Sequence, residues 1–350
     1  MSIKSSIPIL VVAYNRPNSL LRLLKSLSQA IFESDSIELI ISIDKSDTIV
    51  TETVAQNFHW PHGTKEIIAS SDHLGLKNHL LKCGSLLKKY EEIIVLEDDL
   101  IVSPYFYYYS IQACKYYKND PNIASISLHS PRINEFTRKP FHPITNGDDV
   151  YFMQVPSSCG QIWFKRIWSD FEFFLLSEKV EIKNTDRLPL KVKNGWGENT
   201  WKKFFFKFSV INGLYTLFPR ESYSSNTGDP GTHFNQSTQN FQTNLILGKR
   251  SLNFSTFSNS TFKYDHHLEL IPESMKLLNP ALVPYDFETD LLGLKERNVI
   301  KSPYLLSSKP CKNPTLSYGA NLFIPELNIA FNIEGDDYSL GLLSDFELEQ

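Results

Sequence analysis

Glu92-Ile93-Ile94-Val95-Leu96-Glu97-Asp98-Asp99-Leu100 is the stretch that decides the fold of this 350-residue chain. Residues 93–96 form a short, wholly apolar run, which is typical of a buried strand in a parallel sheet. Three carboxylates end that run, at the strand end where open α/β sheets bind ligands. Adjacent acids repel one another unless a cation joins them, and Mg²⁺ or Mn²⁺ suits oxygen ligands. The stretch therefore predicts a central strand that ends at a metal site, with a solvated acidic turn as the alternative.

Further apolar runs predict the rest of an α/β sheet. Residues 8–13, 37–43, 65–69 and 123–128 are each followed by a turn or by a polar segment. Helical patterns separate most of them, because leucines recur on one helical face after Asn18 and Ser19 and a second pattern runs to about Tyr90. Strands that alternate with helices predict a mostly parallel sheet.

Polar residues stand at the ends of these predicted strands. Asn15 and Arg16 follow the first strand, Asp44 follows the second, and Asp98 and Asp99 follow the acidic strand. The carboxyl ends of parallel strands meet at one edge of a sheet, so we expect these side chains to converge. Neither a dinucleotide fingerprint nor a P-loop is present in the sequence. A nucleotide would then be held by carboxylates, with the metal at its diphosphate.

Three segments resemble one known family. PILVVAYNRP (8–17), IISIDKSD (40–47) and IIVLEDDLIVSPYFYYY (93–109) resemble the nucleotide-sugar domain of GT-A glycosyltransferases. N-acetylglucosaminyltransferase I-type enzymes and bacterial family 2 transferases are the most similar members. The resemblance implies a GT-A, Rossmann-like fold with Asp99 as the direct metal ligand, Asp98 at the ribose and Glu97 at the donor sugar. It also implies that Asp44 contacts the uracil and that Tyr14, Asn15 and Arg16 line the nucleotide pocket. Lys77 would contact the phosphates.

The resemblance extends more loosely into an acceptor half. The segment around Trp163 is similar to a tryptophan-rich segment of the bacterial relatives, and Trp163 is either a sugar platform or a core residue. Glu198 lies in a tryptophan-flanked segment where the family carries its catalytic base, although a carboxylate at a helix start is the alternative. Residues 224–233 have the composition of a mobile loop that closes over a nucleotide, in which His233 would contact the diphosphate or the metal.

One predicted amphipathic helix bears on whether the protein contacts a membrane. Trp201, Phe204, Phe205 and Phe208 recur at helical spacing, with lysines beside them. A basic amphipathic helix can bind a membrane surface, but we expect a core-facing helix with solvated lysines. The chain has neither an apolar run of transmembrane length nor a signal-peptide pattern at its start, which predicts a cytoplasmic protein with at most peripheral membrane contact. Four scattered cysteines predict free thiols, and a net charge of −4 argues against a nucleic-acid partner.

Composition changes toward the C-terminus. We expect residues 1–262 to form the glycosyltransferase domain, with a nucleotide-sugar half (1–130) and an acceptor half (131–262). Prolines recur through residues 263–350. This pattern predicts a small β-rich appendage, with one bent strand or two strands at 321–333.

These observations together predict an inverting, metal-dependent glycosyltransferase with a UDP-sugar donor and a saccharide or glycolipid acceptor. The sugar is N-acetylglucosamine in some members of the family. The resemblance also implies a role in bacterial polysaccharide synthesis. A sugar nucleotidyltransferase is one alternative, but it would need a glycine-rich loop after the first strand. A non-catalytic nucleotide-sugar or carbohydrate-binding protein on the same fold is the other.

Overall fold

A nine-stranded sheet is the centre of the molecule. A computed structural model describes residues 6–33, 36–231, 236–249 and 251–348. The strands follow the spatial order β11 (Lys263–Tyr264), β7 (Val150–Met153), β9 (Tyr215–Pro219), β6 (Ile123–Ser127), β8 (Gln161–Phe164), β4 (Glu92–Glu97), β1 (Ile9–Ala13), β2 (Leu39–Ile43) and β3 (Lys65–Ala69). Strands β4, β1, β2 and β3 all pair in parallel. The other half of the sheet, from β8 to β11, contains both parallel and antiparallel pairs. The predicted α/β class with a mostly parallel sheet is therefore confirmed.

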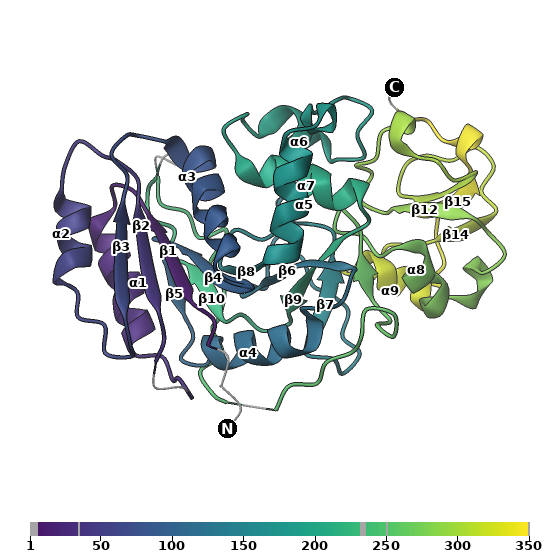
Figure 1. Cartoon of the computed structure of the whole chain (residues 1–350). Coiled ribbons are helices and arrows are strands. Elements are labelled where there is room, and N and C mark those ends of the chain that lie inside the picture. Colours follow the sequence, from purple (N-terminus) through teal and green to yellow (C-terminus); the bar gives the residue numbers. More distant parts are fainter. Residues whose placement is uncertain (1–5, 34–35, 232–235, 250, 349–350) are drawn as a thin grey trace.

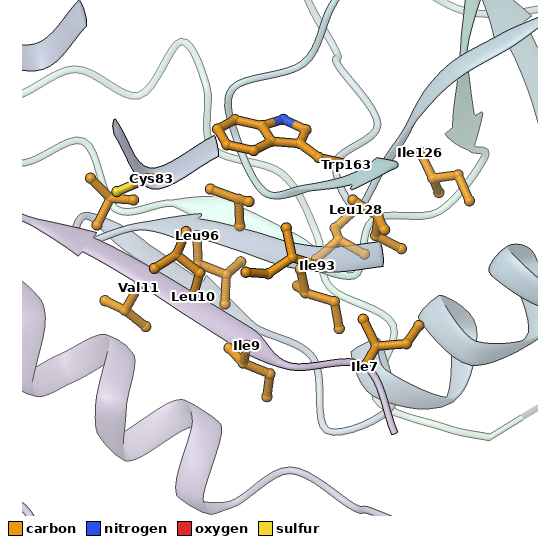
Figure 2. Packing of buried hydrophobic residues seen from close by; sticks show 14 of the residues in the cluster. Ile7, Ile9, Leu10, Val11, Cys83, Ile93, Leu96, Ile126, Leu128 and Trp163 are labelled. Atoms are coloured by element: carbon orange, nitrogen blue, oxygen red, sulfur yellow. The ribbon is translucent and has the colours of Figure 1, made fainter. Parts of the chain in front are cut away.

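The acidic strand is central, as its sequence predicts. β4 lies between β1, to which it is parallel, and β8, to which it is antiparallel. Ile93, Ile94 and Leu96 are completely buried. Figure 2 shows how Ile93 and Leu96 pack against side chains of β1 and beneath the Trp163 ring. A strand buried on both faces leaves only its end free for polar side chains.

Helices cover the sheet on both faces. α3 (Gly75–Gly84), α5 (Lys165–Leu175) and α7 (Trp201–Ile211) lie on one face, and α4 (Phe106–Tyr117) lies on the other (Figure 1). α1 (Pro17–Ser28) packs against α2 (Val50–Asn57), and the short α6 (Leu190–Gly195) precedes α7. In the described part of the chain, no helix combines the length and the apolar character that crossing a membrane requires.

Helix α7 is core-facing, but its lysines are not all solvated. The aromatic face formed by Trp201, Phe204, Phe205 and Phe208 is buried. Lys203 and Lys207, which we expected in solvent, are only 2% and 4% exposed. Each reaches a polar partner, because Lys203 donates to the carbonyl of Trp196 and Lys207 lies 2.7 Å from Asp186. Long aliphatic stems allow lysines to pack in this way while the ammonium groups stay paired.

A second, two-stranded sheet lies beside the acidic end of β4. β5 (Leu100–Val102) follows the acidic residues directly and pairs antiparallel with β10 (Ser224–Asn226). This pairing brings the polar segment after β10 back to the acidic motif, since Thr227 N–H donates to the Asp99 carbonyl at 2.8 Å.

The C-terminal part forms a separate small sheet, at the end of the molecule opposite β3 (Figure 1). Its strand order is β12 (Phe287–Asp290), β13 (Tyr304–Ser307), β15 (Tyr338–Leu342) and β14 (Leu316–Tyr318), with α8 (Pro272–Leu278) and α9 (Pro325–Ala330) beside it. The β-rich character is confirmed. The strand predicted within residues 321–333 is wrong, because Pro325 begins the helix α9 there.

Candidate active site

The polar strand ends converge on one salt-bridged group. Arg16 follows β1 and its guanidinium binds two carboxylates of the acidic motif after β4. Nη1 donates to Asp99 Oδ2 at 2.9 Å, and Nη2 makes a short contact with Asp98. Tyr14 N–H lies 3.4 Å from the second oxygen of Asp98. The ends of β1 and β4 therefore converge, as expected. In the protein itself, Arg16 is the cation that joins Asp98 and Asp99.

Burial and neighbouring charge shift the acidity of the motif. Burial raises the pKa of Glu97 to about 8, and the nearby Asp99 adds to the shift. Burial also raises the pKa of Asp98 to about 6, although the charge of Arg16 opposes that change. The pKa of Arg16 itself lies above its usual value, since the attraction of Asp98 and Asp99 outweighs the effect of burial. Burial thus favours the protonated form of Glu97 more than that of Asp98, whose charge Arg16 stabilises.

Asp44 is buried at the end of β2, where it holds the start of a helix. Its carboxylate accepts hydrogen bonds from the backbone N–H groups of Leu74 and Gly75, each at 2.9 Å. These groups belong to the first turn of α3, whose donors have no partner within the helix. His73 lies 3.1 Å from the same carboxylate, and its ring lies 5.0 Å from the ring of Tyr14. His73 is a pocket residue that the sequence analysis missed.

Asn15 and Lys77 are the other residues predicted at the nucleotide. Asn15 is exposed at the start of the loop after β1. Lys77 is engaged by the segment around α7, because its Nζ lies 3.8 Å from the Phe204 ring centroid and 3.2 Å from the Glu198 carbonyl. The role of Lys77 at a phosphate stays a prediction.

A loop folds back over Arg16 and the first helix. Asp229 accepts a hydrogen bond from Ser19 at 2.6 Å and forms an ion pair with Arg22. Burial opposes ionisation of Asp229, but these partners and Thr227 lower its pKa. A Cβ at Gly231 would lie 2.9 Å from Arg16 Nη1, so glycine lets the loop backbone approach the guanidinium. His233, the last residue expected in this loop, lies outside the described residues.

Glu198 lies before α7, close to where the sequence placed it. Its side chain is 75% exposed and forms a 2.7 Å ion pair with the buried Lys203. α7 begins at Trp201 after the cap residue Thr200, so Glu198 precedes the first turn of the helix. The structure thus places Glu198 beside Lys77, and its role as a base stays a prediction.

Trp163 lies in the core. The residue is 1% exposed on β8, stacked on Trp168 with ring centroids 4.4 Å apart and edge-on to Trp201. Figure 2 shows its ring packed over the aliphatic side chains of the sheet. No face of the ring is open to a sugar, so the platform role is corrected and the core alternative applies.

A second charged pair, which the sequence analysis missed, lies on the other side of the motif. Glu135 Oε2 lies 3.1 Å from Lys202 Nζ, and the charge of Lys202 also acts on Glu97. Nothing in the sequence signals this pair, because 67 residues separate its members.

The acidic motif fits a divalent metal only in part. Arg16 occupies one oxygen of Asp99 and one of Asp98, and Tyr14 N–H takes the other oxygen of Asp98. This leaves the second Asp99 oxygen as the protein ligand. Mg²⁺ is commonly bound by one or two carboxylates, with substrate phosphates and water completing its shell. The residues therefore fit a metal that arrives with a diphosphate, and Asp99 as its direct ligand stays a prediction.

Within the described residues, the one acidic and histidine cluster with three ligand atoms in metal range is elsewhere. Asp265, His266 and His267 follow β11, and their ligand atoms lie within 4.8 Å of one another. Lys295 Nζ already lies 2.7 Å from Asp265 Oδ2, and the other oxygen of Asp265 accepts the backbone N–H groups of His267 and Glu269. An ammonium thus fills this position, which serves as a structural ion pair.

Comparison with known proteins gives partial likeness only. No family model and no curated protein matches the chain. Among solved structures, S. aureus TarS 1–349 in complex with UDP-GlcNAc is 12% identical over 65% of this chain, with a TM-score of 0.42. The mannosyltransferase PcManGT from Pyrobaculum calidifontis in complex with GDP-Man and Mn²⁺ is 13% identical over 61% of this chain, with a TM-score of 0.38. The chain spans 60% of that TarS chain and 54% of the mannosyltransferase chain. The α/β fold is defined by the strand order described above.

Proposed function

We propose that this protein is a glycosyltransferase that moves a sugar from a nucleoside-diphosphate donor, by preference UDP, to a saccharide or glycolipid hydroxyl. The observation that supports this most is the meeting of Tyr14, Arg16, Asp44, Asp98 and Asp99 at the carboxyl edge of the sheet. This edge is where α/β folds bind nucleotides. It offers an aromatic ring, a fixed cation and carboxylates close to one another.

Each of these groups suits one part of a nucleotide sugar. The Tyr14 ring can stack on a base next to Asp44, and Asp98 can accept the ribose hydroxyls as a buried carboxylate. Arg16 carries its charge at every physiological pH and its planar fork matches phosphate oxygens. When bound, Mn²⁺ or Mg²⁺ would be held by Asp99 and would neutralise the leaving diphosphate.

The transfer would proceed with inversion at the anomeric carbon. A single direct displacement needs a donor pocket, an acceptor hydroxyl and one base, without a second carboxylate as nucleophile. Glu198 is the base that the family resemblance favours. We place the activity in bacterial polysaccharide synthesis, at the cytoplasmic side of the membrane, on the same resemblance.

Ligand-dependent unfolding tests the donor class. We expect UDP with Mn²⁺ to raise the unfolding temperature, because a ligand at a hundred times its dissociation constant stabilises by about 2.7 kcal/mol. GDP, ADP, UDP-GlcNAc and GDP-Man complete the panel, each with Mn²⁺ or with EDTA. Asp99→Asn should remove the Mn²⁺-dependent part of the shift and leave the fold intact. If no nucleotide shifts unfolding, the proposal is wrong.

Donor hydrolysis separates an enzyme from a binding protein. A transferase releases UDP slowly from its donor when water replaces the acceptor, whereas a non-catalytic binding protein with the same thermal shift releases none. Slow UDP release that depends on the pocket residues would support catalysis. Binding without release would favour the non-catalytic alternative.

A further inference from the structure

One side chain of the protein bridges the two aspartates of the acidic motif. Arg16 Nη1 donates to Asp99 Oδ2 at 2.9 Å, and Nη2 makes a short contact with Asp98 Oδ1. Asp99 is also the residue to which the proposed function gives the metal. A guanidinium and a divalent metal ion carry charge of the same sign, so they repel each other when both lie beside one carboxylate. Arg16 and a metal ion therefore compete for Asp99.

The two aspartates differ in how firmly they are held. The Asp98 side chain is 3% exposed, and its second oxygen lies 3.4 Å from the backbone N–H of Tyr14. The Asp99 side chain is 16% exposed, and that of Arg16 is 23% exposed. Breaking a buried ion pair costs far more than breaking one that water reaches. Asp98 is thus the anchor of the guanidinium, and Asp99 is the contact that can be released.

We propose that Arg16 is an internal counterion that keeps a metal ion off Asp99 until a donor diphosphate is present; this rests on the proposed glycosyltransferase function. The guanidinium keeps its contact with Asp98 and moves Nη1 from Asp99 to a diphosphate oxygen. The Asp99 carboxylate is then available to the metal ion that accompanies the diphosphate. Arg16 in this way makes the binding of metal depend on the binding of donor.

Charge balance favours this exchange over the addition of a metal ion to the closed group. Asp98 and Asp99 carry two negative charges, and Arg16 keeps its positive charge at every physiological pH. A divalent ion alone would leave the group with an excess of positive charge, in a partly buried place where water screens it poorly. A diphosphate supplies the missing negative charge, and its oxygens match the planar fork of an arginine. Metal and diphosphate should therefore bind tightly together and weakly alone.

The loop after β10 lies against the nitrogen that would move. A Cβ at Gly231 would lie 2.9 Å from Arg16 Nη1, so the loop backbone is close to the group that binds Asp99. The same loop holds the backbone of Asp99, because the N–H and Oγ1 of Thr227 donate to its carbonyl at 2.8 and 2.9 Å. Gly231→Ala would press on Nη1 and disturb the contact between Arg16 and Asp99 without removing a charge.

Binding of Mn²⁺ in the absence of nucleotide tests the inference on the full chain. The electron paramagnetic resonance signal of free Mn²⁺ measures how much of the ion is bound. We expect Arg16→Gln to tighten Mn²⁺ binding by about 5- to 150-fold, the usual range of coupling between two binding events. Gly231→Ala should tighten it less, because the guanidinium remains. Lys25→Gln, an exposed position in α1, is the control for the loss of one positive charge and should bind Mn²⁺ as the wild type does.

Binding of UDP should respond to the same substitution with the opposite sign. In EDTA, Arg16→Gln should bind UDP about tenfold more weakly than the wild type, because the diphosphate loses a charged hydrogen-bond donor. A merely structural role of Arg16 would weaken the binding of both ligands. Adding Asp99→Asn to Arg16→Gln should abolish the gain in Mn²⁺ binding. A gain that survives in this double variant would place the ion elsewhere and overturn the inference.

The outcomes separate this inference from the function on which it rests. If the wild-type protein binds no nucleotide, the proposed function fails and the inference fails with it. If UDP binds but Mn²⁺ binding is unchanged in Arg16→Gln and Gly231→Ala, only the inference is overturned. Equal affinity of the wild type for Mn²⁺ with and without UDP would overturn it as well. Should Arg16→Gln unfold, Arg16→Lys keeps the charge but lacks the planar fork that spans both aspartates, and unchanged Mn²⁺ binding there would count against Arg16.

Discussion

Asp44 holds the start of α3 and, in the proposed function, would also contact the nucleotide base. It is 3% exposed and accepts the backbone N–H groups of Lys45, Leu74 and Gly75. Asp44→Ala should lower the free energy of unfolding by about 1–3 kcal/mol, because buried donors lose their partner. It should also weaken UDP binding with or without metal.

Chemical denaturation and UDP titration measure the two effects of Asp44→Ala. Asp47→Ala, an exposed residue of the same loop, is the control and should change neither. Wild-type stability in Asp44→Ala would show that the helix start does not depend on this carboxylate. Loss of only the metal-dependent binding would move Asp44 to the metal site.

Glu326 in α9 predicts a pH dependence of stability. Burial raises its pKa from 4.5 to about 7. The folded protein thus keeps a proton that the unfolded chain releases between these values, so this residue lowers stability as pH rises from about 4.5 through 7. Glu326→Gln should raise the free energy of unfolding at pH 8.5 by about 1 to 3 kcal/mol, since one pKa unit is worth about 1.36 kcal/mol. At pH 4 the variant and the wild type should unfold alike, and an equal gain at both pH values would contradict the cause given.

Sequence reasoning at the residue scale succeeded where a side chain follows a predicted strand. Arg16 and Asp98 each follow a buried apolar run, so parallel pairing alone brings them together. Glu135 and Lys202 meet because a loop after β6 and the start of α7 pack side by side. That contact depends on tertiary packing, for which neither residue carries a local signal. The prediction that Trp163 forms a sugar platform was wrong, because an aromatic residue in such a segment suits a buried core as well as a sugar-binding surface.

At the scale of elements, agreement between independent sequence signals decided which predictions held. β4 was predictable because its apolar run and its acidic end agree. α9 has six residues, and a short apolar segment does not distinguish strand from helix. Lys207 was misplaced because its partners, Asp186 and Glu181, lie on an earlier segment of the chain. Lys203 was misplaced because it folds back onto Trp196 and Glu198 just before its own helix.

The loop after β10 yields a prediction about its own attachment. Asp229→Ala should free the loop from α1, because it removes the contacts to Ser19, Arg22 and Thr227. We expect faster hydrogen exchange at residues 226–231 and weaker UDP binding, with global stability changed by less than about 1 kcal/mol for these partly exposed partners.

A double-mutant cycle isolates this attachment. Arg22→Ala should reproduce part of the effect, and Arg22→Ala with Asp229→Ala should cost less than the sum of the two single changes. Additive effects would show that the Arg22–Asp229 pair does not hold the loop. Unchanged exchange in Asp229→Ala would show that β10 pairing alone positions it.

At the scale of the whole molecule, buried charges connect the main sheet to the C-terminal sheet. Lys295, after β12, lies 2.7 Å from Asp265, which follows β11 of the main sheet. It also lies 3.9 Å from Glu288, which pairs with Arg187 at 2.7 Å. Whether residues 263–350 form a domain of their own stays a prediction, but the two sheets share this network.

Lys295→Met should therefore destabilise the protein strongly. Removing one partner of a buried pair leaves the other charge uncompensated, at a cost of about 3–5 kcal/mol. Adding Asp265→Asn should restore part of that loss, since no lone charge then remains. Urea unfolding measures both, and Lys301→Met on the exposed surface is the control. If the double variant were less stable than Lys295→Met, the ion pair would not be the cause.

The strand order of the central sheet also has a consequence for synthesis on the ribosome. β1, β2, β3 and β4 are contiguous in the chain and can pair as soon as residue 97 has emerged. β8, the other neighbour of β4, is not made until Gln161–Phe164. During that interval the nascent chain presents the apolar β4 as an open edge, the kind of surface to which chaperones and other unfinished chains bind. The strand that ends at the acidic motif thus keeps one open edge until β8 is made, and synonymous changes that slow translation between residues 97 and 161 would lengthen its exposure.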